Sequence, residues 1–453
     1  MRRASTSQIR SRRALTVALL VVGYSGYYLC RSNLSVAMPM ITDELTASGI
    51  DPAAAKASLG LVASIGVFAY ALGKFFSGPL ADRAGGRRNF LGGIAGAVGF
   101  TLLFALGGSP SWFLAVWCGN RLVQSLGWAG MVKIIARWFP PSSYGTAMAV
   151  VSLSYLFGDA VARSFLGILI DLGLGWRGLF VASAGVLALI GLVCVVFLRE
   201  SPDTVEGEDV GGQVEQPLGS NEAEPVPSEG VVGYLLRSPA FLIVCGLSLG
   251  VTLLRETFNT WTPTYFVEAV GLSKAAAARA SGLFPLAGGA SVLLAGLASD
   301  RLGRPGRGAI LLVGLALAGG ALAALGLVDF RGSTLVPVAL VTAIAFFLLG
   351  PYSYLAGAIA LDFGGRKGGA TASGLIDGIG DLGGVLAGRG MADLASSRGW
   401  SGAFLVLAGV AWCSSLAAAA LVMAQRGTAG RSGLSARPSD PTLTAMEGKE
   451  QLV

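Results

Sequence analysis

The chain has 453 residues, of which 53% are hydrophobic and only 13% charged, and its mean hydropathy is +0.67. An average soluble domain carries about 25% charged residues, so this composition excludes an ordinary soluble protein and indicates one that crosses a membrane several times. The sequence contains no histidine. It also lacks a phosphate-binding Gly-x-x-x-x-Gly-Lys-Ser loop and any cluster with metal-ligand spacing, so we expect no enzyme, no cofactor and no metal site.

Apolar stretches recur along the chain at close to the length of about 20 residues that spans a bilayer. They predict an all-α membrane protein with twelve transmembrane helices, at about 14–41, 58–81, 89–107, 112–134, 144–170, 179–198, 239–266, 278–299, 308–328, 334–361, 370–391 and 401–424. Arginines precede the first stretch, as in a signal peptide, but no small-residue cleavage site ends a short core. We therefore expect the first helix to be retained.

The cations predict the orientation. With a cytoplasmic N-terminus, the loops on that side hold most of the basic residues, and the opposite loops are short and carry isolated charges. The cytoplasmic cations are Arg83, Arg87, Arg88, Arg137, Arg301, Arg304, Arg307, Arg366 and Lys367. We expect a multi-pass protein of the cell (inner) membrane with both termini in the cytoplasm. This asymmetry explains the net charge of +7 without a nucleic-acid partner.

The middle of the chain loses the apolar pattern. Residues 199–236 are rich in Glu, Gly, Pro and Ser, which bury too little surface to fold alone, and a polar tail ends the sequence. The expected organisation is a cytoplasmic tail over 1–13, a six-helix bundle over 14–198, a flexible cytoplasmic linker over 199–236, a second six-helix bundle over 237–425, and a disordered cytoplasmic tail over 426–453.

Internal repeats support two related bundles. The segment Gly-Pro-Leu-Ala-Asp-Arg-Ala-Gly at 78–85 returns as Gly-Leu-Ala-Ser-Asp-Arg-Leu-Gly at 296–303. Gly-Trp-Arg-Gly-Leu-Phe at 175–180 returns as Gly-Trp-Ser-Gly-Ala-Phe at 399–404, at nearly the same offset in the numbering. Transporters built from such repeats bind their substrate near the middle of the membrane between the two halves, so we expect the site there.

Two arginines lie inside apolar stretches. Arg31 and Arg255 are separated by the same offset as the second repeat, and each is eight residues before a proline, Pro39 and Pro263. An arginine at the centre of a membrane helix costs about 2.5 to 3.5 kcal/mol even on the lenient insertion scale, so it needs a wet cavity or an anionic partner. The planar guanidinium binds phosphate or carboxylate oxygens in pairs, so two of them predict a clamp for an anionic substrate. The alternative is that each arginine pairs with an intramembrane carboxylate, such as Glu256 beside Arg255.

These motifs resemble the major facilitator superfamily. The Gly-x-Leu-Ala-Asp-Arg-x-Gly signature is typical of it, and Tyr-Tyr-Leu-Cys-Arg-Ser-Asn-Leu-Ser-Val-Ala-Met-Pro at 27–39 is similar to the first helix of the organophosphate:phosphate antiporters. Further similar segments are 73–75, 124–128 with Lys133, 253–255 and 261–265. The resemblance implies that Arg31 and Arg255 hold the phosphate of the substrate, and that the substrate is a phosphorylated metabolite exchanged for inorganic phosphate.

Other candidates for substrate binding surround the arginines in sequence. Lys74 either lines the cavity, as the resemblance implies, or extends along the helix toward the headgroups near Asp82. The aromatic residues Tyr27, Tyr28 and Trp261 are either hydrogen-bond donors beside the anion or ordinary packing.

Helices five and eleven depart from the family pattern. Where glycerol-3-phosphate transporters use a histidine of helix five, this chain has Tyr155. Asp159 and Arg163 are four residues apart and can pair on one helix face. The eleventh helix carries Asp377 and Asp381, which either neutralise Arg163, Arg389 or Arg255, or bind substrate hydroxyls or a transported proton. The glycines Gly378, Gly380, Gly383, Gly384 and Gly388 would let this helix approach its neighbours closely.

Two pairs at helix ends suit another task. Asp82 and Arg83, with their repeat Asp300 and Arg301, lie beside basic loops, so we expect them to form gating contacts between helices. Arg121, with Gln124 and Gly127, resembles a helix-four motif of proton-coupled members of the superfamily, and a buried hydrogen-bonding role is the alternative.

The resulting hypothesis is a secondary transporter that exchanges a small phosphorylated anion, glycerol-3-phosphate or a sugar phosphate, for inorganic phosphate by alternating access. Two alternatives stay open. One is a sugar-phosphate sensor of the same fold, and the other is a proton-coupled transporter of an organic anion. We expect a monomer that contacts membrane lipid and no nucleic acid.

Overall fold

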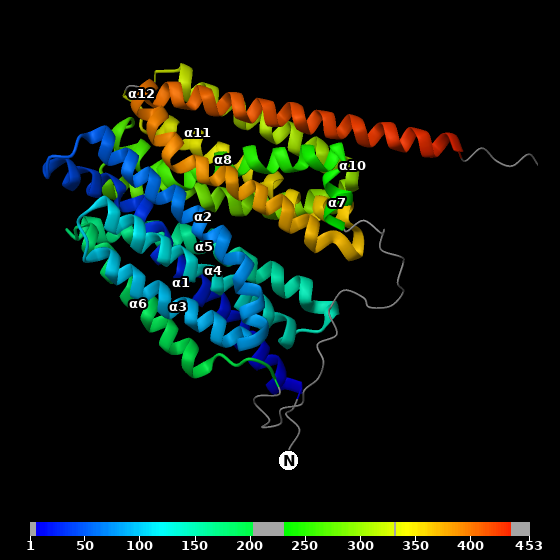
Figure 1. Cartoon of the computed structure of the whole chain (residues 1–453), viewed down its shortest axis with the longest axis horizontal. Coiled ribbons are helices and arrows are strands. Elements are labelled where there is room, and N and C mark those ends of the chain that lie inside the picture. The colour runs from blue at the N-terminus through cyan, green and yellow to red at the C-terminus, as the bar shows by residue number, and fades with distance from the viewer. Residues whose placement is uncertain (1–5, 203–230, 330–331, 436–453) are drawn as a thin grey trace, which may run out of the picture.

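The computed structural model describes residues 6–202, 231–329 and 332–435, which are helical with no strand (Figure 1). The helices are α1 (Thr6–Ala47), α2 (Pro52–Ala84), α3 (Gly86–Ala105), α4 (Pro110–Trp138), α5 (Pro141–Asp171), α6 (Trp176–Phe197), α7 (Val231–Leu236), α8 (Pro239–Glu268), α9 (Lys274–Ser281), α10 (Leu283–Leu327), α11 (Leu335–Tyr354), the π-helical turn η2 (Leu355–Ile359) and α12 (Ala360–Ser435).

Several helices begin at a proline that follows a polar cap. The Asp51 carboxylate accepts a hydrogen bond from the N–H of Ala54 at 3.0 Å, and Pro52 opens α2. The hydroxyl of Ser238 likewise precedes Pro239 at the start of α8. Proline suits this position because its missing N–H would have no partner in the first turn, while the cap satisfies one of the exposed donors.

The predicted twelve membrane spans are confirmed. Ten segments of the described chain are long and apolar enough to cross a membrane. The helix α4 carries Arg121 and Lys133 and packs among the others as the eleventh span. The segment Thr371–Met423 is one of the ten, but it contains two spans that are divided at Gly399, and this gives the twelfth span. At about 1.5 Å per residue, this segment is far too long for one crossing.

Glycines with positive φ mark the repeat in the backbone. Gly85 separates α2 from α3 with φ of 92°, and Gly303, its equivalent in the second copy of the signature, divides α10 with φ of 62°. Gly399 in α12 has φ of 69°. Such conformations cost glycine little because it has no Cβ, so each provides a sharp corner between two spans. The duplicated signature is therefore a duplicated turn.

The helices form two bundles that lie side by side (Figure 1). Helices α1–α6 make the first bundle, and α8–α12 make the second. Contacts between them run through α1 with α8, α2 with α12, and α5 with α9 and α10. Six spans in each bundle bring the start of α1, the end of α6, the start of α8 and the end of α12 to one face, here called the terminal face. The opposite end of the molecule is called the far face.

The expected boundaries change in three places. The first helix begins at Thr6, well before residue 14, and α12 continues to Ser435, beyond the expected start of the tail at 426. The linker was expected to be flexible to residue 236, but its end forms α7, whose Leu235 is buried in the apolar core. Residues 203–230 and 436–453 lie outside the described part of the chain.

The two bundles meet at equivalent positions of the repeat. The hydroxyl of Ser35 in α1 donates to the backbone carbonyls of Asn259, at 2.9 Å, and Thr260, at 2.7 Å, in α8. Ser35 and Asn259 are separated by the same offset as Arg31 and Arg255. The carbonyl of Asn259 is free for this bond because Pro263, four residues later, has no N–H to donate. The intramembrane proline thus supplies an acceptor between the bundles.

Ion pairs and close backbone contact tie the bundles together toward the far face. Lys56 of α2 pairs with Glu268 of α8 at 2.5 Å, and Lys274 of α9 pairs with Asp43 of α1. Arg279 of α9 also pairs with Asp171 of α5, and the α2 backbone touches α12 where Gly60 and Gly388 meet. These contacts close the far face in this structure.

Candidate functional site

The first arginine of the predicted clamp lies among tyrosines. In α1, Nη1 of Arg31 donates to the hydroxyl of Tyr28 at 2.9 Å, and its guanidinium carbon is 5.1 Å from the centre of the Tyr28 ring. The same carbon is 4.3 Å from the centre of the Tyr70 ring in α2. Among the described residues, Arg31 has no carboxylate within ion-pair distance. Its partners are the neutral hydroxyl of Tyr28 and two aromatic faces, which leave its charge available to an anion.

Tyr70 gathers three cations around one ring. Besides Arg31, the guanidinium carbon of Arg121 in α4 is 4.7 Å from the centre of the ring, and the ammonium of Lys74 is 5.4 Å from it. Aromatic rings attract cations through the negative potential of their faces. Tyr70 therefore holds three positive charges close together that would otherwise repel one another.

The second arginine enters from the other bundle. In α8, Nη2 of Arg255 is 2.8 Å from Oε1 of Glu256, and its guanidinium carbon is 4.8 Å from the centre of the Tyr352 ring of α11. The Nε atom of Arg255 is buried and has no hydrogen-bond partner. Glu256 is close enough to Arg31 and Arg121 for their charges to interact.

The alternative interpretation applies to Arg255, because Glu256 pairs with it, and the anion clamp stays a prediction. However, the charges of Arg31 and Arg121 also interact with this carboxylate, so three guanidinium groups share one negative charge and positive charge remains in excess. Such an excess inside a membrane protein is costly unless an anion or water compensates it. The arrangement can bind an anion between the bundles.

Lys74 connects this group to the eleventh span. Its ammonium is 2.7 Å from a carboxylate oxygen of Asp377 and 2.9 Å from one of Asp381, both in α12. The lysine side chain is therefore directed across the bundle interface and does not extend toward Asp82. The two aspartates neutralise neither Arg163 nor Arg389, since Arg163 pairs with Asp159 and Arg389 with Asp393.

The predicted aromatic residues divide into two groups. Tyr28 lies at Arg31, and Tyr155 lies within electrostatic reach of Arg255 and Tyr28. Tyr27 instead donates its hydroxyl to the carbonyl of Phe90 at 2.7 Å and is buried in the first bundle. The structure places it in the packing and away from the anion site.

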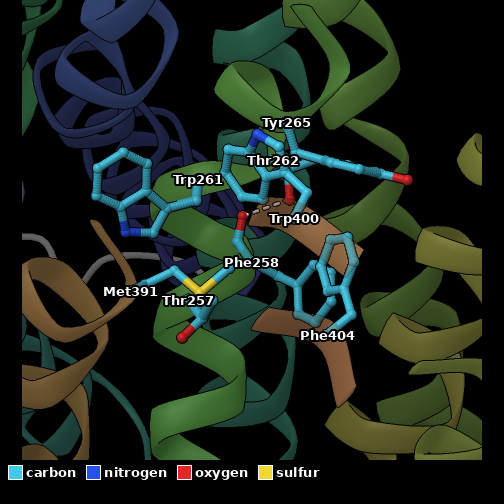
Figure 2. Close-up of a pocket in the computed structure, with 8 residues that line it drawn as sticks. All are labelled: Thr257, Phe258, Trp261, Thr262, Tyr265, Met391, Trp400 and Phe404. Atoms are coloured by element: carbon cyan, nitrogen blue, oxygen red, sulfur yellow. Dashed lines mark hydrogen bonds between the residues drawn. The ribbon is translucent and has the colours of Figure 1, made fainter. Parts of the chain in front are cut away.

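Trp261 is also placed away from the arginines. Its indole N–H donates to the carbonyl of Ala387 at 3.0 Å, and its ring packs near Trp400. Figure 2 shows it in an apolar pocket between α8 and α12, with Phe258, Met391 and Phe404 among the lining residues. The pocket contains none of the cations, and this side chain stabilises the second bundle.

Asp159 and Arg163 pair as their spacing predicted, but they act between the bundles. Nε of Arg163 is 3.0 Å from Oδ1 of Asp159, which also accepts a hydrogen bond from Ser32. Arg163 further donates from Nη2 to the carbonyl of Asn259 at 2.8 Å and from Nη1 to Ser281 at 3.2 Å. Both charged side chains are almost completely buried. They form a second polar connection at the carbonyl that Pro263 leaves free.

The expected gating residues lie near the terminal face. Asp82 is exposed and pairs with Lys133 of α4 at 2.9 Å, a contact within the first bundle. Arg83 and Arg301 are exposed. The side chain of Asp300 lies outside the part that the structure describes.

The sequence interpretation did not single out Tyr70, Tyr352 or the position of Arg121 at the site. Tyr70 carried a signal, because it is four residues before Lys74 and shares its helix face. Tyr352 carried no such signal in the sequence, since its place beside Arg255 depends on the contact between α8 and α11.

In the described residues, no group of acidic residues and cysteines is arranged to hold a metal ion.

The fold and the site define a membrane transporter of two related bundles. The sequence model of the Major Facilitator Superfamily matches residues 20–388, most of the chain. The chain belongs to this superfamily.

Curated relatives confirm the more specific resemblance. A "Probable hexose phosphate transport protein" from Chlamydia muridarum is 27% identical over 399 residues, covering 85% of each chain. The "Glycerol-3-phosphate transporter" of Bacillus subtilis is 25% identical over 404 residues, covering 86% of this chain and 87% of the relative. The "Membrane sensor protein UhpC" of Salmonella typhimurium is 27% identical over 410 residues, covering 87% and 88%. These names are those of the organophosphate:phosphate antiporter family.

Solved structures share the fold. A bacterial homologue of the human lysosomal transporter Spinster, in an inward-facing and unoccupied conformation, has a TM-score of 0.66 at 18% identity and covers 92% of this chain and 97% of that one. A POT family transporter in complex with 5-aminolevulinic acid has a TM-score of 0.67 at 14% identity, covering 88% and 94%.

Proposed function

We propose that the protein is a secondary transporter that exchanges an organic phosphate, glycerol-3-phosphate or a sugar phosphate, for inorganic phosphate by alternating access. One observation carries the proposal: the carboxylate of Glu256 pairs with Arg255 of the second bundle and lies close enough to Arg31 and Arg121 of the first for their charges to interact, which leaves positive charge in excess. A phosphate dianion would balance this excess charge, and each guanidinium offers it two parallel donors. The relatives named as phosphate-ester transporters support the same substrate class.

The closed far face supports a route for the anion. With both termini in the cytoplasm of an inner-membrane protein, as the distribution of basic residues indicates, the site of this conformation would open toward the cytoplasm. Binding between Arg31 and Arg255 would draw the two bundles together, and opening the far face would then require the contacts of Lys56 and Lys274 to break. In this proposal the protein acts as a monomer, because each chain contains both halves of the site.

Phosphate exchange in proteoliposomes tests the proposal. Vesicles loaded with inorganic phosphate should take up labelled phosphate, and external glycerol-3-phosphate or glucose-6-phosphate should inhibit this uptake. Arg31→Lys and Arg255→Lys should each reduce the exchange by about a hundredfold, because lysine keeps the charge but cannot donate two parallel hydrogen bonds. Arg177→Lys is the matched control, since Arg177 pairs with Glu44 near the far face. Absence of exchange by folded wild-type protein would contradict the proposal.

A sensor is the second candidate, because a relative of similar identity bears the name of a membrane sensor protein. The same anion site would serve detection without transport. Sugar-phosphate binding that stabilises the protein, together with no measurable flux, would favour this candidate. Proton-coupled anion transport is the third, because Asp377 and Asp381 lie at the site, and it predicts uptake driven by a pH gradient without internal phosphate.

A further inference from the structure

The charges between the bundles form two groups of opposite sign. Arg31, Arg121 and Arg255 with Glu256 form the cationic group, which has a surplus of two positive charges. Lys74 with Asp377 and Asp381 forms the acidic group, which has a surplus of one negative charge. The groups are neighbours, because Lys74 and Arg31 share the ring of Tyr70, and the charges of both aspartates act on Arg255.

We infer that the organic phosphate bound here also carries a positively charged amino group, and that Asp377 and Asp381 bind this group while the arginines bind the phosphate. The inference rests on the proposed function and specifies its substrate class. The two groups together have a surplus of one positive charge, which a phosphate dianion and one ammonium balance in sum. A phosphate dianion whose other groups are only hydroxyls would leave the two groups with a surplus of one negative charge, which is unfavourable away from bulk water.

The geometry of Lys74 shows that the acidic group accommodates an ammonium. One nitrogen contacts both carboxylates, at 2.7 and 2.9 Å, with the face of Tyr70 nearby. Lys74 belongs to the first bundle and the aspartates to the second, so this ammonium can leave when the bundles move. A phosphate at the arginines offers Lys74 a new charged partner, and a substrate amino group then takes its place between the aspartates.

Two unsatisfied polar atoms independently indicate a ligand. The hydroxyl of Thr252 in α8 has no hydrogen-bond partner although its residue is only 1% exposed. It lies 2.9 Å from the position that a Cβ on Gly380 would take. Gly380 stands between the two aspartates in the sequence of α12. The second atom is the buried Nε of Arg255, which also lacks a partner. Buried polar groups are normally satisfied, so a free donor in the cationic group and another beside the segment of α12 that carries the aspartates suggest ligand polar atoms there.

Inorganic phosphate fits the same site without an amino group. It would bind at the arginines while Lys74 stays between Asp377 and Asp381, as in the present structure. With inorganic phosphate bound, Lys74 would stay between the aspartates, whereas with the organic phosphate bound it would contact the phosphate. This makes the acidic group a determinant of selectivity among organic phosphates.

Matched competitors test the inference. Glucosamine-6-phosphate and glucose-6-phosphate differ only in an amino or hydroxyl group at carbon 2, and each would compete with labelled phosphate for exchange in proteoliposomes. We expect the amino compound to inhibit at a concentration at least about tenfold lower, as for a hydrogen bond between charged groups. Asp377→Asn and Asp381→Asn should bring the ratio of inhibitory concentrations close to one, and Asp381→Glu should preserve the preference.

Asp393→Asn is the control. Asp393 lies on the same helix but is 54% exposed and pairs with Arg389, so its removal should leave the ratio unchanged. Equal inhibition by the two compounds in the wild type would overturn the inference while leaving phosphate exchange intact. A preference that persists in the Asp377→Asn/Asp381→Asn double variant would also overturn it.

Thermal unfolding in detergent separates this inference from the proposed function. If the wild type exchanges no phosphate, the proposed function fails, but the unfolding temperature with each ester still decides the amino-group inference. A larger rise with glucosamine-6-phosphate that Asp381→Asn abolishes supports it. Equal rises, or no rise with either compound, contradict it.

Discussion

The contact between Gly60 and Gly388 predicts how the far face can be opened. A Cβ added at Gly388 would lie 2.4 Å from the carbonyl oxygen of Gly60 and 2.5 Å from the hydroxyl of Ser64. Both distances are well below an ordinary contact, and the nearest atoms belong to backbone or a short side chain. Gly388→Ala therefore requires α2 and α12 to separate.

The energetic cost follows from what is lost. Overpacking costs about 1 to 3 kcal/mol. Separation would also weaken the hydrogen bonds that Ser64 donates to the carbonyl of Val385, at 2.5 Å, and accepts from the N–H of Arg389, at 2.8 Å. Because relief of the clash offsets part of these losses, we expect a shift of about 2 kcal/mol against the closed far face. That corresponds to about a 30-fold change in the ratio of open to closed molecules.

Double electron–electron resonance measures this shift. Spin labels at Ala53 and Ala269, which are exposed near the far face on opposite bundles, report the separation of α2 from the end of α8. Gly388→Ala should move the distance distribution to longer values. Gly390→Ala is the matched control, since a Cβ at Gly390 would meet no atom within 4 Å. Identical distributions for the wild type, Gly388→Ala and Gly390→Ala would refute the reasoning.

Two further substitutions test the connections between the bundles, and a third tests the cations gathered at Tyr70. Pro263→Ala restores an N–H donor to the carbonyl of Asn259, so it should weaken the inter-bundle bonds there and increase far-face opening in the same resonance measurement; an unchanged distribution would contradict this. Asp159→Asn leaves the charge of Arg163 buried and unpaired, so the free energy of unfolding should fall by about 3 to 5 kcal/mol in a denaturant titration, and adding Arg163→Gln should recover part of it. If the double variant lost as much free energy of unfolding as the two single variants added together, the residues would not act as a pair. Tyr70→Leu should lower the unfolding temperature by removing the ring between three cations while Tyr70→Phe should not, and equal effects would assign the role to the hydroxyl.

The spans were predictable because each depends on local composition. A bilayer requires about 20 apolar residues per crossing, and this requirement is visible in sequence without knowledge of the packing. The repeat was predictable for a related reason, since Gly303 must adopt the same left-handed turn as its equivalent Gly85. Helix ends were less predictable, as the early start of α1 at Thr6 shows, because a helix can continue into water beyond the membrane.

The site was predictable in its cations and less so in their partners. Arg31, Arg255 and Lys74 were evident because a charge inside an apolar stretch is costly and needs a reason. The partners of Lys74 lie far away in the sequence, and only the packing of α2 against α12 brings them together. Of the two roles left open for Trp261, its contacts match packing, because six residues after Arg255, at about 100° per residue, it lies well away from the face of the arginine.

The bond between Ser35 and Asn259 joins positions that the repeat makes equivalent. In a twofold-symmetric dimer of identical six-helix chains, a contact of this kind would be isologous and would occur twice across the axis. In the fused chain the donor is a serine on one side and an asparagine occupies the matching position on the other. The two halves therefore no longer play equivalent roles at the axis. The first half donates a hydroxyl and a guanidinium, and the second half supplies the carbonyl that accepts both hydrogen bonds.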